Sequence, residues 1–259
     1  MECRLLMTDL DGTLLREDKT LSERTKNMLK SCREKGIYIV YATARSEAEA
    51  GRVLSAFPPD GVISNAGARI SFGGKVIGRQ MLSAHTVRGI IRMCRELAGE
   101  HAEITVDCEK GYFWNYRDKN SLGPGYEQAI YSDFADFSEA AYKVTPYLER
   151  EADARKIAEA FPECDLTLFS GMAWRRFAAR EADKGRALRQ LAEHLGISKE
   201  NIVAFGDDFS DIPMLEAAGR GVAMGNAIEE VKKAADDIAL SNEEDGVAAY
   251  MEKHFLKKT

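Results

Sequence analysis

Runs of consecutive apolar residues alternate with segments of helical periodicity in the N-terminal part of the chain. Residues 4–8 and 37–43 form apolar runs without alternation of polar and apolar positions, which is typical of strands buried on both faces of a parallel sheet. A third strand is expected at residues 61–64, and a helix that a Pro-Pro pair ends is expected at residues 46–57. This order of elements predicts βαβ units.

A further helix is expected between the first two strands. Apolar residues recur there near helical spacing, at Leu21, Met28, Leu29 and Cys32. Thr20 or Ser22 is expected to cap this helix, with Thr20 and Glu23 forming a capping box, and Gly36 is expected to end it. The glycine pair at residues 73–74 predicts a β-hairpin.

The same alternation of strands and helices is predicted near the C-terminus. Helices are expected at residues 183–195, 212–218 and 227–235, and buried strands at residues 202–205 and 221–224. We therefore expect the two ends of the chain to form one Rossmann-like, doubly wound and mostly parallel sheet.

Residues 82–182 have a different pattern. One amphipathic helix is expected at residues 84–98, followed by strands at residues 104–106, 112–115, 142–144, 166–169 and 174–177. This mixture is typical of an inserted α+β domain. The predicted fold class is therefore α/β, with a core of residues 1–81 and 183–259 and an inserted α+β cap domain of residues 82–182.

The composition narrows the functions open to this chain. Its 259 residues fit one large domain or two moderate ones, and 45% hydrophobic with 30% charged residues are typical of a soluble globular protein. The 36 Lys and Arg against 42 Asp and Glu give a net charge of −6, which offers no general attraction to nucleic acid or an anionic membrane. We expect neither as a partner. We expect the protein to be a monomer or a homodimer.

The five cysteines form an odd, widely spaced set without a C-x-x-C pair, which argues against a disulfide framework and a zinc cluster. The four histidines also lack metal-site spacing. The N-terminal apolar stretch is too short and too acidic for a signal peptide, and no run approaches the roughly 20 apolar residues that span a bilayer. These observations predict a cytoplasmic location.

The strongest chemical signal is the segment Asp9-Leu10-Asp11-Gly12-Thr13, directly after the first predicted strand. Residues two apart in an extended segment point to the same side, so both carboxylates aim at the sheet edge where open α/β sheets bind ligands. Two close carboxylates persist when a cation lies between them or one stays protonated. The alternative is a helix-cap aspartate followed by an ordinary Asp-Gly turn.

A second acidic pair, Asp207 and Asp211, follows the strand predicted at residues 202–205. Taken alone, Asp211 fits the first turn of a helix, where the helix dipole stabilises a carboxylate. Two acidic clusters after two buried strands favour instead a hard cation such as Mg²⁺, which binds carboxylates while keeping waters for a substrate phosphate.

Thr43 and Lys184 are candidates for binding a phosphate. Thr43 ends the second predicted strand, where its hydroxyl and the following amides can face an anion. Lys184 opens the helix predicted at residues 183–195, where a cation opposes the helix dipole at a cost of up to about 1 kcal/mol. That cost argues for an anionic partner, although each residue taken singly is also an ordinary strand-end threonine or solvated lysine.

The order of these motifs resembles the haloacid dehalogenase (HAD) superfamily, and within it the Cof-type phosphatases, whose C2 (type IIB) cap is inserted after the third core strand. The resemblance covers the whole chain. It matches four motifs in order, at Asp9, Asp11, Gly12 and Thr13, then Thr43, then Lys184, then Gly206, Asp207 and Asp211.

The resemblance implies that Asp9 is the nucleophile and that Asp11 is the general acid and base. It implies that Thr43 and Lys184 bind the phosphoryl oxygens. Because Asp11 lies near other negative charge, we expect a raised pKa that lets it act as an acid near neutral pH. The implied Mg²⁺ site comprises Asp9, Asp11 through its backbone carbonyl, Asp207 and, close by, Asp211.

Three positions depart from the Cof pattern. Ala44 stands in place of a common glycine, Ser210 in place of a usual asparagine, and Asn65 comes one residue early, so that Ala66 takes its usual place. These departures concern the fine contacts to phosphate and substrate and leave the nucleophile, the acid and the metal ligands intact.

The implied activity is a Mg²⁺-dependent hydrolysis of small phosphorylated metabolites, sugar phosphates or similar monoesters, through an aspartyl-phosphate. One alternative is a sugar phosphomutase of the same superfamily. Another is a non-catalytic phospho-acceptor or Mg²⁺-binding signalling protein.

Substrate choice is expected to lie in the insert, which would close over the core as a cap. Alternation places Tyr112, Trp114 and Tyr116 on one face of a strand. Trp114, together with Trp174 and Arg175 of a second stretch, are candidates for contacting substrate. The alternative is that these residues belong to the core and surface of the cap sheet.

Overall fold

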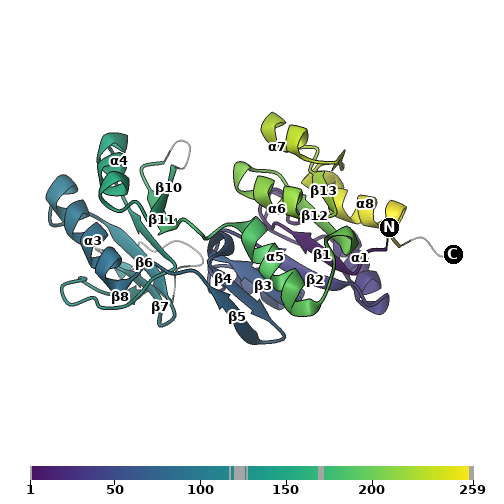
Figure 1. Ribbon diagram of the computed structural model, residues 1–259, viewed down its shortest axis with the longest axis horizontal. Coiled ribbons are helices and arrows are strands. Elements are labelled where there is room, and N and C mark those ends of the chain that lie inside the picture. The colour runs from purple at the N-terminus through teal and green to yellow at the C-terminus, as the bar shows by residue number, and fades with distance from the viewer. Residues whose placement is uncertain (1, 117, 120–125, 127, 169–171, 257–259) are drawn as a thin grey trace. The chain divides into compact units, whose positions relative to one another are not determined.

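The computed structural model describes residues 2–116, 118–119, 126, 128–168 and 172–256. The chain divides into two compact units (Figure 1). One comprises Met1–Gly78 with Asp183–Thr259, and the other comprises Arg79–Ala182. The predicted boundary after residue 81 lies slightly beyond the observed one after Gly78.

The first unit contains one large sheet. In sheet order its eight strands are β14 (Asp237–Ile238), β13 (Arg220–Ala223), β12 (Ile202–Gly206), β1 (Leu5–Thr8), β2 (Tyr38–Ala42), β3 (Gly61–Ser64), β4 (Arg69–Phe72) and β5 (Lys75–Arg79). Neighbours from β14 to β3 are parallel, and β4 is antiparallel to β3. Strand β1 pairs with β2 on one side and with β12, from the other end of the sequence, on the other. The predicted α/β class with a shared, mostly parallel sheet is confirmed.

Helices accompany the strands of this unit. They are α1 (Glu23–Glu34), α2 (Gly51–Ala56), α5 (Lys184–Leu195), α6 (Ile212–Ala217), α7 (Glu229–Ala234) and α8 (Gly246–His254), with 3-10 turns η1 (Asn65–Gly67), η3 (Lys199–Asn201), η4 (Phe209–Asp211) and η5 (Asn242–Glu244). Helix α1 packs against α8, and α5 packs against α6. The C-terminal helix α8 has no counterpart among the predicted elements.

The N-terminus of α1 corrects one predicted cap. The Oγ atom of Ser22 accepts a hydrogen bond from the Thr25 amide at 3.0 Å, so Ser22 is the N-cap. The capping box predicted for Thr20 and Glu23 is wrong. The Thr20 amide and hydroxyl donate to the Asp18 carboxylate instead, at 2.9 and 2.6 Å, in a local turn before the helix.

Helix α2 is shorter than the helix predicted at residues 46–57. The Ser46 amide donates to Oε2 of Glu49 at 2.7 Å, and the Glu49 amide donates to Oγ of Ser46 at 3.2 Å. These reciprocal bonds close a turn ahead of the helix. The α-helix therefore begins at Gly51 and ends at Ala56.

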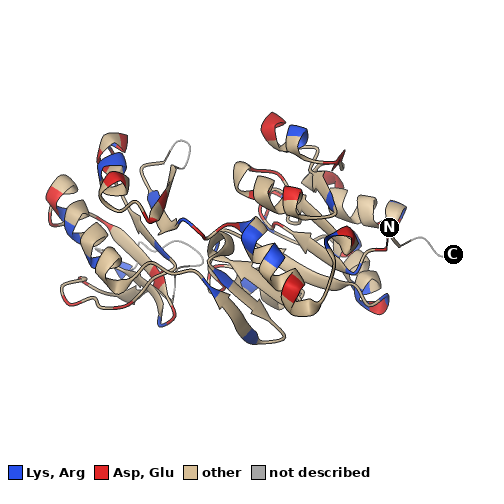
Figure 2. Ribbon diagram, in the orientation of Figure 1, with Lys and Arg blue, Asp and Glu red and all other residues tan. Residues whose placement is uncertain are grey.

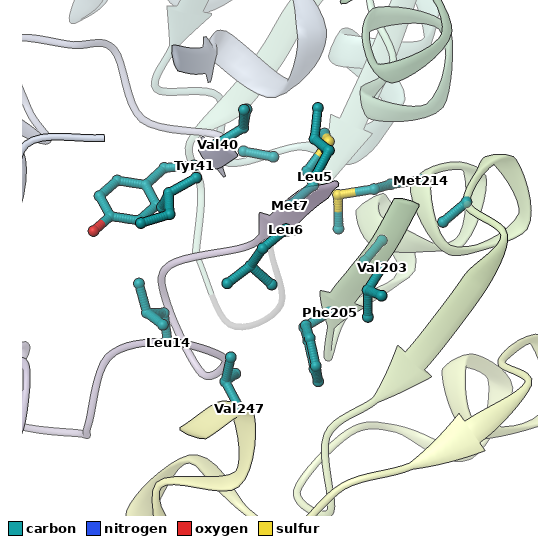
Figure 3. Packing of buried hydrophobic residues seen from close by; sticks show 14 of the residues in the cluster. Leu5, Leu6, Met7, Leu14, Val40, Tyr41, Val203, Phe205, Met214 and Val247 are labelled. Atoms are coloured by element: carbon teal, nitrogen blue, oxygen red, sulfur yellow. The ribbon is translucent and has the colours of Figure 1, made fainter. Parts of the chain in front are cut away.

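The core of this unit surrounds β1. Leu5, Leu6 and Met7 are each fully buried, although successive side chains of a strand point to opposite faces. Figure 3 shows them among side chains from β2, β12 and the helices, including Val40, Phe205, Met214 and Val247. Burying a side chain of this size contributes about 1.5–3 kcal/mol. Burial on both faces explains why the sequence of β1 lacks alternation.

The second unit contains a separate six-stranded sheet. In sheet order its strands are β10 (Cys164–Leu168), β11 (Arg175–Ala179), β9 (Lys143–Pro146), β6 (Ile104–Cys108), β7 (Gly111–Trp114) and β8 (Ile130–Tyr131). Helices α3 (Ala84–Ala98) and α4 (Glu151–Ala160) pack on one face, where Val87, Ile91 and Ile157 belong to the same hydrophobic cluster as Val106 and Phe177. This unit is thus an α+β layer with one helix-covered face.

The predicted elements of the insert agree with the structure to different degrees. The bounds of α3 match the prediction, whereas α4 was not predicted. The strand predicted at residues 142–144 lies at Lys143–Pro146, and the one predicted at residues 174–177 lies at Arg175–Ala179. Residue 169, at the end of another predicted strand, lies outside the described residues.

Charge is distributed over both units. Figure 2 shows Lys and Arg interspersed with Asp and Glu on the helices of each. Over the part of the chain that the structure describes, no helix has the length and apolar character needed to cross a membrane.

Candidate active site

Two acidic segments from opposite ends of the chain meet at one edge of the core sheet. Strand β1 pairs in parallel with β12, with Thr8 opposite Phe205, so Asp9 and Asp207 both follow the carboxyl end of their strands. The Asp9 amide donates to the Phe205 carbonyl at 3.0 Å. Carboxylate oxygens of Asp9, Asp207 and Asp211 all lie within 4.8 Å of one another. The predicted convergence of these residues is therefore present.

Gly12 allows this convergence. Its φ of +81° lies in the left-handed region that favours glycine, and a Cβ built there would be 2.3 Å from Oδ2 of Asp207. The neighbouring Thr13 hydroxyl donates to Oδ1 of Asp207 at 2.6 Å. The Gly-Thr pair that follows Asp11 thus brings the Asp207 carboxylate close to the first acidic segment and orients it.

Lys184 lies between two of the carboxylates. Its Nζ donates to Oδ1 of Asp9 at 2.7 Å and to Oδ1 of Asp211 at 2.5 Å, and the side chain is 1% exposed. Asp183 caps the helix, because its carboxylate accepts from the Arg186 amide. Burial alone would lower the pKa of Lys184, but the charges and hydrogen bonds of Asp211 and Asp9 raise it overall, so the ammonium form is retained.

Both oxygens of Asp211 already have partners. While Oδ1 accepts from Lys184, Oδ2 accepts from the amides of Asp207 and Asp208 at 3.0 and 3.1 Å. A Cβ at Gly206 would lie 2.4 Å from the Cβ of Asp211, so glycine permits this close approach. These contacts favour a role for Asp211 in positioning Lys184 and the loop after β12.

The carboxylate cluster has an excess of negative charge. Burial raises the pKa of Asp9; the charge of Lys184 opposes this, and the charges of Asp211 and Asp207 add to it. Burial raises the pKa of Asp207 to about 6. The hydrogen bond from Thr13 opposes this rise, and the charge of Asp211 adds to it. Lys184 bonds to two of the three clustered carboxylates, those of Asp9 and Asp211. This all-oxygen donor set fits a hard divalent cation such as Mg²⁺.

Asp11 lies apart from this cluster. Its Oδ2 accepts from Nε of Arg45 at 2.7 Å and its Oδ1 from Nη2 of Arg45 at 2.5 Å, while Lys19 lies 2.9 Å from Oδ1. Burial raises the pKa of Asp11, but the hydrogen bonds and charges of Arg45 and Lys19 lower it overall. The expected raised pKa is therefore wrong for this arrangement, since two cations, rather than other carboxylates, surround the group.

Thr43 follows β2 at the same sheet edge. Its amide donates to the Ile63 carbonyl at 2.8 Å, and its carbonyl accepts from the Ala66 amide at 2.9 Å. Its buried hydroxyl accepts from the Arg45 amide at 3.1 Å. Asn65 and Ala66 have φ values of 52° and 57°, so the segment with the displaced asparagine adopts a left-handed turn directly beside Thr43.

Sequence reasoning missed three side chains that shape the site. These are Lys19 and Arg45, which hold Asp11, and Asn226, whose Nδ2 donates to the Gly12 carbonyl at 2.8 Å. Arg45 follows Thr43 by two residues, so its place near the sheet edge was predictable. No local pattern links residues 19 or 226 to the acidic segments.

The two tryptophans of the insert come together, and Arg175 does not join them. The rings of Trp114 and Trp174 lie 5.9 Å apart. Arg175 is buried, donates to the carbonyls of Met172 and Trp174, and shares the sheet face of Phe177, which the helices cover. Adjacent residues of an extended segment point to opposite faces, so Arg175 and Trp174 lie on opposite faces of the sheet. Arg176 shares the tryptophan face instead. The substrate contact predicted for Arg175 stays a prediction.

The family follows from comparison with known proteins. A family model for haloacid dehalogenase-like hydrolases matches residues 6–251. The chain belongs to this family. Phosphatase YwpJ of Bacillus subtilis is 31% identical, over 98% of this chain and all of that protein. Pyridoxal phosphate phosphatase YbhA of Escherichia coli is 27% identical, over 99% of this chain and all of that protein.

A solved structure gives the subclass. The HAD subclass IIB sugar phosphatase BT4131 superposes with a TM-score of 0.83 at 25% identity, and the match covers 98% of this chain and 100% of that one. The chain is therefore a Cof-type HAD phosphatase, as the motif resemblance implied.

Proposed function

We propose that this phosphatase hydrolyses monoesters of small phosphorylated metabolites, sugar phosphates or similar compounds, through a phosphoryl group carried on Asp9. The observation that carries the proposal is the placement of the Asp9 carboxylate at the end of β1, bonded to buried Lys184 and close to Asp207. An anionic nucleophile beside a fixed ammonium suits phosphoryl transfer, whose transition state spreads charge over the phosphoryl oxygens.

The donor set supports a Mg²⁺ site. Asp9 and Asp207 would hold the ion through carboxylate oxygens, and the backbone carbonyl of Asp11 would join them, as in the family pattern. The carboxylate of Asp211 lies within the same cluster, although its oxygens are bonded to Lys184 and two amides. When bound, the ion supplies positive charge that lets a phosphate approach a carboxylate nucleophile.

The proposed reaction has two steps. An oxygen of Asp9 forms a bond to phosphorus while the ester P–O bond breaks, and the leaving oxygen takes a proton from Asp11. Water then loses a proton to Asp11 and attacks phosphorus, which releases phosphate and restores Asp9. Since Asp11 is ion-paired with Arg45 and Lys19, it has to separate from these cations before it can carry a proton.

Lys184 and Thr43 are assigned to the phosphoryl group. The Lys184 ammonium is a point charge held by Asp9 and Asp211, and it can donate a further hydrogen bond to a phosphoryl oxygen with little reorganisation. Thr43 would donate its hydroxyl proton to another oxygen while its own loop amides hold the backbone.

Replacement of the nucleophile tests the proposal. Asp9→Asn should reduce release of inorganic phosphate from sugar phosphates to background, because an amide cannot form the acyl phosphate, while circular dichroism stays unchanged. Exposed Asp136→Asn is the matched control. Substantial remaining turnover in Asp9→Asn would falsify the assignment of the nucleophile.

Analysis of the products separates the alternatives. Isomerised sugar phosphate in excess of free phosphate would favour a phosphomutase, and long-lived phosphoprotein without release would favour a signalling role. The names of the relatives, which are phosphatases, support hydrolysis. The cytoplasmic location and the monomeric or homodimeric state stay predictions.

A further inference from the structure

The segment after β1 is bonded at four points to the C-terminal part of the same unit. The carbonyls of Gly12 and Leu15, the side chain of Arg16 and the amide of Glu17 each have a partner there. The partners are Asn226 and residues of segment 242–245, which we call the anchor segment. They lie outside the HAD motifs matched in the sequence. The loop with the first acidic segment is therefore held from outside its own motif.

Two asparagines form a continuous bridge to this loop. Nδ2 of Asn226 donates to the Gly12 carbonyl at 2.8 Å, and its Oδ1 accepts from the Asn242 amide at 3.0 Å. The side chain of Asn242 is buried, and its Nδ2 donates to the Leu15 carbonyl at 2.9 Å. The bridge thus holds both ends of the turn that contains Thr13, the residue that orients Asp207.

An ion pair holds the next part of the loop. Nε and Nη2 of Arg16 donate to Oδ1 and Oδ2 of Asp245 at 3.2 and 2.9 Å. A bidentate pair of this kind fixes the orientation of both groups as well as their distance. The neighbouring Glu17 amide donates to Oε1 of Glu243 at 2.7 Å. The position and direction of the chain at residues 16–17 are therefore fixed.

This part of the loop presents Lys19 to Asp11. The Lys19 amide donates to the Arg16 carbonyl at 2.9 Å, and the Arg16 amide donates to the Thr20 carbonyl at 3.1 Å. Lys19 has a φ of +63°, a conformation that a lysine keeps only where its surroundings hold it. Its Nζ lies 2.9 Å from Oδ1 of Asp11. The ion pair of Arg16 thus stabilises the turn that places a cation on the Asp11 carboxylate.

The anchor segment is itself fixed. The amide and hydroxyl of Ser241 donate to Oε2 of Glu244 at 3.2 and 2.7 Å, in a capping box around η5. The Gly246 amide donates to the Ser241 carbonyl at 2.9 Å, and Asp245 between them has a φ of +54°. A closed turn of this kind offers the loop partners in one defined position.

We propose that Asn226 and the ion pair of Arg16 with Asp245 position the loop after β1 for the phosphatase reaction. They act through the backbone of the loop and are therefore positioning residues. The proposal rests on the proposed function in one respect, because it takes this loop to carry the nucleophile and the acid. Misplacing reacting groups by about 1 Å lowers a rate on the order of 100-fold.

A second ion pair provides a matched control for Arg16. Arg24 of α1 donates through Nε and Nη2 to Oε2 of Glu252 of α8, at 3.2 and 2.6 Å, so it also joins distant parts of the chain. We expect Arg16→Met to lower kcat for phosphate release at least about fivefold with KM within about twofold, because Lys184 keeps its contacts. Arg24→Met should keep kcat within about twofold of wild type. The substrate is the sugar phosphate that the wild type hydrolyses fastest.

Two substitutions of Asn226 separate positioning from charge. Asn226→Asp keeps the acceptor for the Asn242 amide and loses the donor to the Gly12 carbonyl, whereas Asn226→Ala loses both. We expect both variants to lower kcat at least about tenfold. Asn27→Asp and Asn27→Ala, at an exposed position of α1, are the controls. A loss of kcat confined to Asn226→Asp would reflect its added charge and would overturn the positioning role.

Hydrogen exchange measured by mass spectrometry reads the loop without a substrate. The amides of Thr13, Leu14, Leu15, Arg16 and Lys19 donate within the loop. In Arg16→Met and Asn226→Ala these amides should exchange at least about fivefold faster than in wild type, while the amides of α5 keep their rates. Circular dichroism and thermal unfolding report whether each variant folds, and Arg24→Met should leave exchange in the loop unchanged.

The two readouts separate this proposal from the proposed function. Faster exchange in the loop with wild-type kcat overturns the positioning role, and so does slower turnover with unchanged exchange. Wild-type exchange and wild-type kcat in both variants overturn it as well. Wild-type protein that releases no phosphate from any ester overturns the proposed function instead, and faster exchange in the variants then still supports anchoring of the loop.

Discussion

At the scale of single residues, Lys184 explains how the carboxylates of Asp9 and Asp211 coexist in the interior. Its ammonium bonds to Asp9 and Asp211 and is almost fully buried. Removing one partner of a buried ion pair leaves the other charge uncompensated, which costs more than the pair itself contributes. The same ammonium is assigned to the phosphoryl group, so stability and chemistry depend on one side chain.

Lys184→Met should therefore destabilise the protein by about 3–5 kcal/mol in the absence of added cation, and should abolish phosphate release. Urea unfolding monitored by circular dichroism measures the first effect. Lys30→Met, at an exposed position of α1, is the control and should change stability by less than about 0.5 kcal/mol. Equal stability of the two variants would contradict the assigned role of the buried ammonium.

At the scale of elements, the turn after β1 determines the geometry of the acidic cluster more than the strand itself does. Gly12 at φ +81° brings the first acidic segment against Asp207, and the Asn226 side chain holds its carbonyl. Gly36, after α1, also has positive φ, +72°, but no atom lies within 4 Å of a Cβ built there. The two glycines thus share a backbone requirement and differ in their surroundings.

Gly12→Ala and Gly36→Ala form a matched pair. Each places an L-residue in the left-handed region, which costs about 1–2 kcal/mol. Only the methyl group added in Gly12→Ala also overlaps the Asp207 carboxylate. We therefore expect the kcat/KM of Gly12→Ala to fall at least about 100-fold, while the kcat/KM of Gly36→Ala stays within about twofold of wild type. A Gly12→Ala enzyme with wild-type kcat/KM would show that the close approach to Asp207 is dispensable.

At the scale of the whole molecule, parallel pairing of β1 with β12 joins segments almost 200 residues apart into one acidic edge. Thr13 and Asp207, which share a hydrogen bond, are 194 positions apart in sequence. The resulting cluster is short of positive charge, since burial and neighbouring carboxylates raise the pKa of both Asp9 and Asp207. Binding of a divalent cation should therefore be coupled to folding of the first unit.

Mg²⁺ should raise the thermal midpoint of that unit. An ion at 100 times its dissociation constant contributes about 2.7 kcal/mol to the folded state, which corresponds to a shift of several degrees. Asp207→Asn should lose most of the shift, whereas Asp208→Asn, at the next residue along, should keep it. Differential scanning calorimetry with and without Mg²⁺ measures both. Identical shifts in the two variants would argue against Asp207 as a ligand.

Much of this protein's structure can be predicted from local patterns in its sequence. Apolar runs, helical spacing and glycine turns are properties of neighbouring residues, so most strands, α3 and the order of motifs Asp9, Thr43, Lys184 and Asp207 could be predicted. The short strands β8 and β14 were not. The general position of these residues follows too, because the carboxyl ends of parallel strands share one edge. The residue that caps a helix was less predictable where two nearby residues could both do so, as Thr20 and Ser22 could before α1.

Tertiary structure alone decided which side chains meet. Arg45 and Lys19 hold Asp11 and lower its pKa, and Lys184 occupies one oxygen of Asp211. The physical reason is common to both. A side chain's charge state and partners depend on groups from distant segments at distances of a few ångströms, which periodicity along the chain does not encode.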